Sequence, residues 1–199
     1  MRNVLIVFSG KAQSGKSTSA KVLQDVLGTN KVEIYSFATA LKKIAQEYFN
    51  WDGIDKGIYM HDVKVPDQRG HRIVSQPIPD KGRQLLINIG QYMRKIRSTI
   101  WIDYVVNQIK KEISIGSDRI FVIDDLRFRN ELELVKVIQP CISIRLTRNS
   151  QLDLNDISET DLDNSEFDYY IDNNGTIEDL KKELSKVYED ILFKVKNDN

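Results

Sequence analysis

The residues with the clearest chemistry form a glycine-bracketed loop near the start of the sequence, Gly10-Lys11-Ala12-Gln13-Ser14-Gly15-Lys16-Ser17. This loop fits the pattern G-x-x-x-x-G-K-[ST] at every fixed position. The glycines allow an anion to approach the backbone closely, and the loop amides then form a nest for phosphate oxygens. A helix beginning at the end of the loop adds partial positive charge. The predicted nucleotide-phosphate contacts are Gly10, Lys11, Ser14, Gly15, Lys16, Ser17 and Thr18.

Two neighbouring acids could hold the metal ion that accompanies a nucleotide. We expect Lys16 to neutralise the β- and γ-phosphates of ATP and the Ser17 hydroxyl to bind Mg²⁺. An apolar strand over 120–123 runs directly into Asp124 and Asp125. Because side chains alternate along a strand, only one of these two acids can face the phosphates. The residues thus predict ATP and Mg²⁺ as ligands and leave open which acid serves the metal.

A series of arginines could hold a second anion against the first. A positive charge about 4 Å from a phosphate contributes on the order of 4 kcal/mol before desolvation, and the guanidinium fork can grip phosphate at two points. The arginines in question are Arg83, Arg94, Arg97, Arg127, Arg129, Arg145 and Arg148. They favour a phosphotransferase over a GTPase switch, whose guanine-reading Asn-Lys-x-Asp motif is approached only by Asn30-Lys31-Val32-Glu33.

Strands alternate with helices along the chain, and this predicts an α/β fold with a mostly parallel five-stranded sheet and helices on both faces. The predicted strands cover 4–8, 32–37, 120–123, 141–146 and 169–171. The predicted helices cover 17–27, 39–49, 84–95, 101–115, 130–138 and 176–194, the last opened by a capping box of Thr176 and Asp179. Residues 51–82, with three of the four prolines, are predicted to be loop-rich.

Composition limits the classes of function. The chain has 199 residues, and its 29 Lys and Arg balance its 29 Asp and Glu, so we expect one domain over 1–199 and no nucleic-acid partner. The apolar run Val4–Phe8 is too short for a membrane span or a signal-peptide core. We therefore expect a cytoplasmic protein. Cys141 is the only cysteine, so no internal disulfide is expected.

Several blocks, taken in order, resemble the phage-type deoxynucleoside monophosphate kinases, a P-loop kinase family with a three-layer fold. The blocks are Phe8–Thr18, Ser36-Phe37-Ala38 with Leu41-Lys42, Gly82–Leu86 with Gly90, Arg94 and Trp101, Asp125–Phe128 with Glu131, and Ser158-Glu159, Leu162, Asp168 and Ile171–Gly175. The resemblance implies phosphoryl transfer from ATP to a deoxynucleoside 5′-monophosphate. It also implies an acceptor-binding insertion at about 51–115 and a lid at about 148–166. Residues 61–80 form a longer excursion than the core of this family requires, and a wider acceptor pocket or an extra hairpin could be located there.

The resemblance also implies roles for individual residues. Arg83 and Arg127 would hold the acceptor phosphate with support from Arg94, and Trp101 would line the nucleoside pocket or belong to the core. Asp125 would hold Mg²⁺ with Ser17. Lys16, Arg127 and Arg148 would act in catalysis, although Arg145 is an alternative to Arg148 at the transferring phosphate. The expected partners are small-molecule nucleotides, and a homodimer is left open.

A second family shares part of this pattern. The ending Leu162-Asp163-Asn164, Phe167-Asp168 and Asn174-Gly175 is similar to that of the animal-type phosphomevalonate kinases, whose loop is richer in basic residues. The blocks around Arg83 and Arg127 favour the nucleotide kinases. A nucleotide-binding module without transferase activity is the third alternative.

Overall fold

A computed structural model of the chain describes residues 3–51, 53, 59–67, 70–78, 81–138, 140–149 and 157–197. For most of 59–78, and for residues 81, 83 and 195–197, this description covers the backbone alone. The chain forms two compact units, one made of Met1–Phe37 with Ile102–Asn199 and the other of Ala38–Trp101. The single domain over 1–199 with an insertion at about 51–115 stays a prediction.

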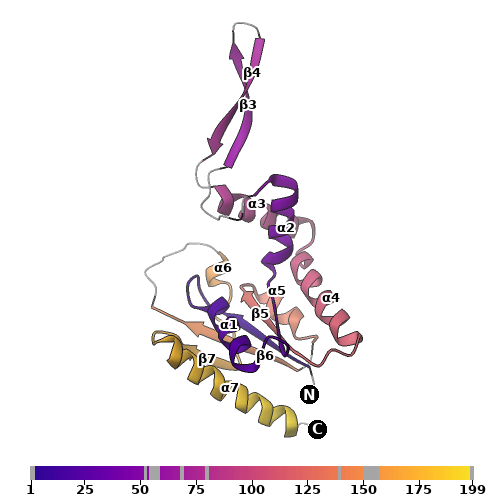
Figure 1. The fold of residues 1–199 in the computed structure, drawn as a ribbon, viewed down its shortest axis with the longest axis vertical. Helices are drawn as coiled ribbons and strands as arrows, with labels where there is room; N and C mark the ends of the chain where they lie inside the picture. Colours follow the sequence, from indigo (N-terminus) through magenta and orange to yellow (C-terminus); the bar gives the residue numbers. More distant parts are fainter. Residues whose placement is uncertain are drawn as a thin grey trace. The chain divides into compact units, whose positions relative to one another are not determined.

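The first unit is built on a five-stranded sheet, and this confirms the predicted fold class (Figure 1). Its strands are β1 (Val4–Ser9), β2 (Val32–Tyr35), β5 (Ile120–Leu126), β6 (Cys141–Thr147) and β7 (Tyr169–Asp172). Their spatial order is β2-β5-β1-β6-β7, and every neighbouring pair is parallel. All six residues of β1 are buried, as expected for a central strand covered on both faces.

The strand order places ligands at the end of β1. The chain leaves β1 for β2 on one side of the sheet and later crosses to β6 on the other side. Open α/β sheets bind ligands at such a point of reversal, outside the carboxyl ends of the strands. The glycine-bracketed loop follows β1 directly. The segments that follow β5 and β6 therefore flank this loop and can supply side chains to whatever it binds.

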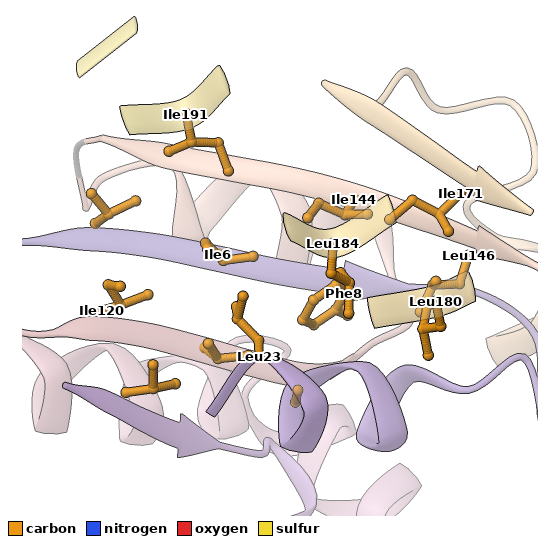
Figure 2. Packing of buried hydrophobic residues seen from close by; sticks show 14 residues of the cluster. Ile6, Phe8, Leu23, Ile120, Ile144, Leu146, Ile171, Leu180, Leu184 and Ile191 are labelled. Atoms are coloured by element: carbon orange, nitrogen blue, oxygen red, sulfur yellow. The ribbon is translucent and has the colours of Figure 1, made fainter. Parts of the chain in front are cut away.

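Helices cover both faces of this sheet. On one face α1 (Lys16–Leu27) and α7 (Ile177–Asn197) contribute Leu23 and Leu184 to a cluster that includes Ile6 and Phe8 of β1 (Figure 2). The alternate residues of β1 point to the other face. The connection from β1 through α1 runs toward the β2 edge of the sheet. The connections through α4 (Ile100–Ser114) and α5 (Arg129–Val135) run toward the β7 edge. Right-handed crossovers therefore put these two helices on that other face. No helix in the described ranges is both long and apolar enough to cross a membrane.

The last helix starts as the sequence predicts. Thr176 Oγ1 accepts a hydrogen bond from the Asp179 amide at 3.2 Å, and Asp179 Oδ2 accepts one from the Thr176 amide at 3.0 Å. This reciprocal pair is the predicted capping box, and it satisfies two amides that a helix end would otherwise leave without partners. The hydrogen bonds from Thr176 lower the pKa of the exposed Asp179 carboxyl below 3.8.

The second unit contains α2 (Ala38–Phe49), β3 (Tyr59–Asp67), β4 (Gly70–Ile78) and α3 (Lys81–Ile96). Strands β3 and β4 pair antiparallel over their full length, so the prediction of a loop-rich segment over 51–82 is wrong for these residues. The β-branched residues of the two segments favour strands. Pro66 and Pro77 misled the prediction, because a two-stranded ribbon has only edge strands and these tolerate proline.

The single cysteine, Cys141, opens β6. Its side chain is partly buried in the sheet. Burial, with the negative charge of Asp168 as a smaller cause, raises the pKa of its thiol from 9.0 to about 12. The thiol is therefore protonated at neutral pH, and since thiolates are the reactive form of cysteine, it is a poor nucleophile.

Candidate active site

The loop after β1 has the backbone of a phosphate nest. Gly10 and Gly15 have φ values of 150° and 98°, and Gln13 between them has a φ of 63°. A Cβ on Gly10 would lie 2.5 Å from the carbonyl oxygen of Leu146, so glycine is needed there for space as well as for conformation. Gln13 is held in the left-handed region, which is uncommon for a residue with a side chain and recurs at functional sites.

Lys16 turns back over this loop. Its Nζ donates to the carbonyl oxygens of Gly10 at 2.6 Å and Lys11 at 2.9 Å. Burial, followed by the positive charge of Arg127, lowers the pKa of Lys16 from 10.5 to about 8. Lys16 is also the first residue of α1, whose first turn carries no acidic side chain. The ammonium and the positive end of the helix dipole therefore meet at one place and favour an anion there.

Asn173 braces the loop from the end of β7. Its buried Nδ2 donates to the carbonyl oxygen of Ser14 at 2.9 Å, and its own amide donates to Thr147 at the end of β6 at 2.8 Å. A Cβ on Gly15 would lie 2.2 Å from Asn173 Nδ2. The second glycine of the motif thus leaves room for this side chain, which ties the loop to the far side of the sheet.

The two acids at the end of β5 have different partners. Asp124 hydrogen-bonds with the Ser17 side chain, and burial raises the pKa of Asp124 above 3.8 in spite of that bond. Asp125 accepts hydrogen bonds from Ser36 Oγ at 2.6 Å and from the Phe37 amide at 2.8 Å. Asp125 therefore fastens the end of β2 to β5, and Asp124 lies beside the hydroxyl predicted to bind Mg²⁺. The role of Asp125 as a metal ligand stays a prediction.

The backbone of Arg127 is fixed by Glu131. The carboxylate of this buried glutamate accepts hydrogen bonds from the amides of Arg127 at 2.8 Å and Phe128 at 3.1 Å. The resemblance block that runs from Asp125 to Glu131 thus has a physical explanation, since acids at its two ends hold the turn that carries the arginine. The charge of Arg127 acts on Lys16 more strongly than any other side-chain charge does.

A short segment after residue 156 lies against the loop. Helix α6 (Ile157–Thr160) carries the buried Glu159, which accepts a hydrogen bond from the Ala12 amide at 2.5 Å and forms an ion pair with the Arg127 guanidinium. Arg145 on β6 donates to Ser9 Oγ at 2.9 Å and pairs with Asp163 at 2.7 Å. Two cations near the loop, Arg127 and Arg145, are thus each paired with an acid.

The remaining predicted residues of the first unit are at the surface. Lys11, Ser17, Thr18 and Arg148 are exposed, and Lys11 Nζ lies 3.7 Å from Asp163. Arg148 comes directly after β6, whereas Arg145 is partly buried beside the loop. Of the predicted lid, residues 150–156 lie outside the described residues.

Three of the predicted acceptor residues, Arg83, Arg94 and Trp101, belong to the second unit. Trp101 is buried and its indole N–H points to the Gly90 carbonyl oxygen at 3.4 Å, which is the environment of a core tryptophan. Arg94 is half-buried in the last turn of α3. Arg83 lies near the start of α3, and its side chain is outside the described residues. Their roles in acceptor binding stay predictions.

Solved kinases share the architecture of this chain. Thymidylate kinase from Ehrlichia chaffeensis is 12% identical, the match covers 94% of this chain and 100% of that one, and the TM-score is 0.50. The chain has a P-loop kinase fold. At this identity the likeness shows the fold alone. APS kinase from Mycobacterium tuberculosis is 10% identical over 94% of this chain and 98% of that one, with a TM-score of 0.44.

Another similar structure is a sugar kinase from a Janibacter species, 14% identical over 92% of this chain and 91% of that one, with a TM-score of 0.45. No protein-family model and no curated protein matches the sequence.

Sequence reasoning gave no role to two residues that contact the glycine-bracketed loop of residues 10–17, which is the P-loop of this fold. Glu159 and Asn173 stand in the resemblance blocks without an assigned function. Their contacts with the P-loop join residues 147 and 159 positions apart. Asn173 follows the strand predicted over 169–171, whereas Glu159 lies in the predicted lid, where the sequence predicted no helix or strand.

Proposed function

We propose that the chain transfers the γ-phosphoryl group of ATP to a small phosphorylated acceptor. The observation that carries this proposal is the convergence of the P-loop amides, the Lys16 ammonium and the guanidinium of Arg127 at the carboxyl end of β1. Two phosphate groups brought end to end need positive charge beside them, because positioning and charge neutralisation carry the rate of phosphoryl transfer.

The proposed acceptor is a deoxynucleoside 5′-monophosphate. The order and spacing of the sequence blocks support it, and the contacts of Asp125 and Glu131 give the block around Arg127 a physical reason. The predicted acceptor roles of Arg83 and Arg94 rest on the sequence blocks alone. An acceptor phosphate is already anionic at neutral pH, so the reaction needs no general base.

Mg²⁺ fits the side chains next to the P-loop. The Ser17 hydroxyl and the Asp124 carboxylate hydrogen-bond with each other, and both offer the oxygen ligands that this ion prefers. We propose that these two residues hold it, in place of the pair formed by Ser17 and Asp125. When bound, the ion supplies charge neutralisation at the β- and γ-phosphates.

Residues of the protein itself hold the reacting phosphates and stabilise their charge during transfer. An acceptor oxygen forms a bond to the γ-phosphorus while the bond from that phosphorus to the β-phosphate bridging oxygen breaks, which leaves ADP. Lys16 holds the phosphates of ATP, and Arg127 holds the acceptor phosphate and stabilises the negative charge on the group in transfer. Arg145, held by Ser9 and Asp163, is better placed for this task than the exposed Arg148.

A coupled assay of ADP release tests the proposal. Wild-type protein with ATP and Mg²⁺ is given each deoxynucleoside monophosphate, phosphomevalonate, or no acceptor. We expect ADP release only with a deoxynucleoside monophosphate. Release with phosphomevalonate would favour the second kinase family, and binding of ATP with no release under any condition would leave a nucleotide-binding module.

Two variants test the assigned residues in the same assay. We expect Lys16→Ala to abolish turnover while its melting temperature stays close to that of the wild type. We expect Arg127→Ala to raise the KM of the acceptor more than the KM of ATP. Arg129→Ala is the matched control, because Arg129 is exposed and its guanidinium contacts the Asp161 carbonyl oxygen, away from the P-loop. Equal effects of the two arginine substitutions would contradict the role given to Arg127.

A further inference from the structure

The carboxylate of Glu159 lies where the P-loop presents its donors. One oxygen accepts the Ala12 amide at 2.5 Å, and the other pairs with the guanidinium of Arg127. The side chain is buried although it is charged. A buried charge is costly unless partners satisfy it, so these two donors are what keeps Glu159 in place.

Both donors are of the kind that binds phosphate. A main-chain amide in a nest and an arginine fork hold phosphate oxygens in the same way that they hold carboxylate oxygens. The charge of Glu159 also acts on Lys16, where it opposes the effects of burial and of Arg127. The carboxylate thus meets three groups to which the proposed function assigns a phosphate.

We infer that Glu159 is an internal anion that occupies a phosphate position between the P-loop and Arg127, and that a bound polyphosphate displaces it. The inference rests on the proposed function only in that the P-loop binds the phosphates of a nucleotide. Displacement costs the ligand part of its binding energy. It also frees the Arg127 guanidinium to contact the group in transfer. Binding of the nucleotide in place of the Glu159 carboxylate therefore changes the contacts of Arg127.

A permanent positioning role for Glu159 makes the opposite prediction. If the carboxylate stays in place to orient Arg127, its removal should weaken phosphate binding or leave it unchanged. If it competes with phosphate, its removal should strengthen binding. The affinity of a ligand falls in proportion to the fraction of protein in which its position is available. The sign of the change in affinity therefore separates the two roles.

The test is calorimetric titration of the full chain with inorganic tripolyphosphate, which has the charges of a nucleotide tail and no base. Glu159→Gln keeps the shape of the side chain without its charge, and Glu159→Ala removes the group. We expect both variants to bind tripolyphosphate about tenfold more tightly than the wild type, which corresponds to a wild-type position that is about nine-tenths filled by the carboxylate.

Asp161→Asn is the matched control, because it removes a carboxylate two residues away that accepts the Arg129 amide. Within the described part of the chain this carboxylate forms no hydrogen bond or ion pair with the P-loop. The affinity of this variant should equal that of the wild type. Thermal unfolding of each variant shows that it is folded before titration.

Unchanged or weaker binding by both Glu159 variants would overturn the inference and leave the proposed function intact. Absence of tripolyphosphate binding in the wild type and in all variants would overturn both. Tighter binding by the Glu159 variants, together with absence of ADP release from the wild type with any acceptor, would retain the inference and overturn only phosphoryl transfer.

Discussion

Individual side chains in this protein hold the P-loop and its arginine in place through contacts that span most of the chain. Asn173 braces the loop from β7, Glu131 fixes the backbone of Arg127, and Asp125 fastens the end of β2. These three side chains act by holding other groups of the site in place and need no contact with a substrate. Each satisfies a backbone group that would otherwise leave the site loosely held, which is how preorganisation is achieved in sites of this kind.

We predict that Asn173→Ala weakens both the fold and the site. The substitution leaves the Ser14 carbonyl oxygen without its buried donor, and the loss of such a partner costs about 1–3 kcal/mol. The loop then gains freedom, so the affinity for ATP should fall several-fold. Urea denaturation and calorimetric titration measure the two effects. Asn107→Ala, at an exposed position of α4, is the control, and equal behaviour of the two variants would contradict the bracing role.

The glycine-rich motif was sufficient to predict the loop, the lysine and the serine, because their chemistry depends on neighbours in sequence. The choice between Asp124 and Asp125 could not be predicted, since it depends on which acid faces Ser17 and which faces Ser36. Glu159 and Asn173 were beyond prediction for the same reason. Their partners in the P-loop are more than 140 positions away, and spacing along the chain carries no information about such contacts.

At the scale of elements, the pattern of apolar residues predicted all five strands of the parallel sheet and every helix of the sheet connections except the short α6. Helix ends were predicted within about three residues, and differences of this size occur at the start of α3, the end of α5 and the end of α7. The hairpin of β3 and β4 was only one of two possibilities for 61–80, beside a wider acceptor pocket, and its strands were not predicted. Prolines and glycines indicated loops, and nothing local in the sequence showed that two short extended segments would pair with each other.

The capping box of α7 gives a prediction that depends on pH. Thr176→Ala removes the hydroxyl that bonds to the Asp179 amide and carboxylate, and we expect the melting temperature to fall by about 2–4 °C near neutrality. The folded pKa of Asp179 is lowered from 3.8. Its contribution is therefore fully present above 3.8 and is lost as the pH falls through the lower folded value.

Urea denaturation of the wild type and Thr176→Ala over this range measures the effect. The difference in unfolding free energy between them should shrink below pH 3.8. Thr29→Ala, exposed in the turn after α1, should match the wild type throughout. A difference that grows as the pH falls would contradict the ionic part of the cap.

For the molecule as a whole, an apolar cluster on one face of the sheet joins the central strands to α1 and α7 and contributes to the stability of the first unit (Figure 2). Leu184→Ala removes a side chain that is 2% exposed, and we expect a loss of about 2–5 kcal/mol in the free energy of unfolding. Phe193→Ala, on the same helix but 67% exposed, should change it by less than about 0.5 kcal/mol. Urea denaturation of both variants tests whether burial on α7, and not helix content alone, holds the unit together.

The one thiol of the protein, at the start of β6, can report unfolding through its reactivity. With a pKa near 12, Cys141 should react with a maleimide or disulfide reagent far more slowly than an unfolded cysteine does at the same pH. Opening of the start of β6 should therefore speed up labelling, so that its rate reports local opening without any engineered probe. A ligand that tightens the centre of the sheet should slow this labelling, and a cysteine placed elsewhere on the surface could be modified selectively without first removing the native one.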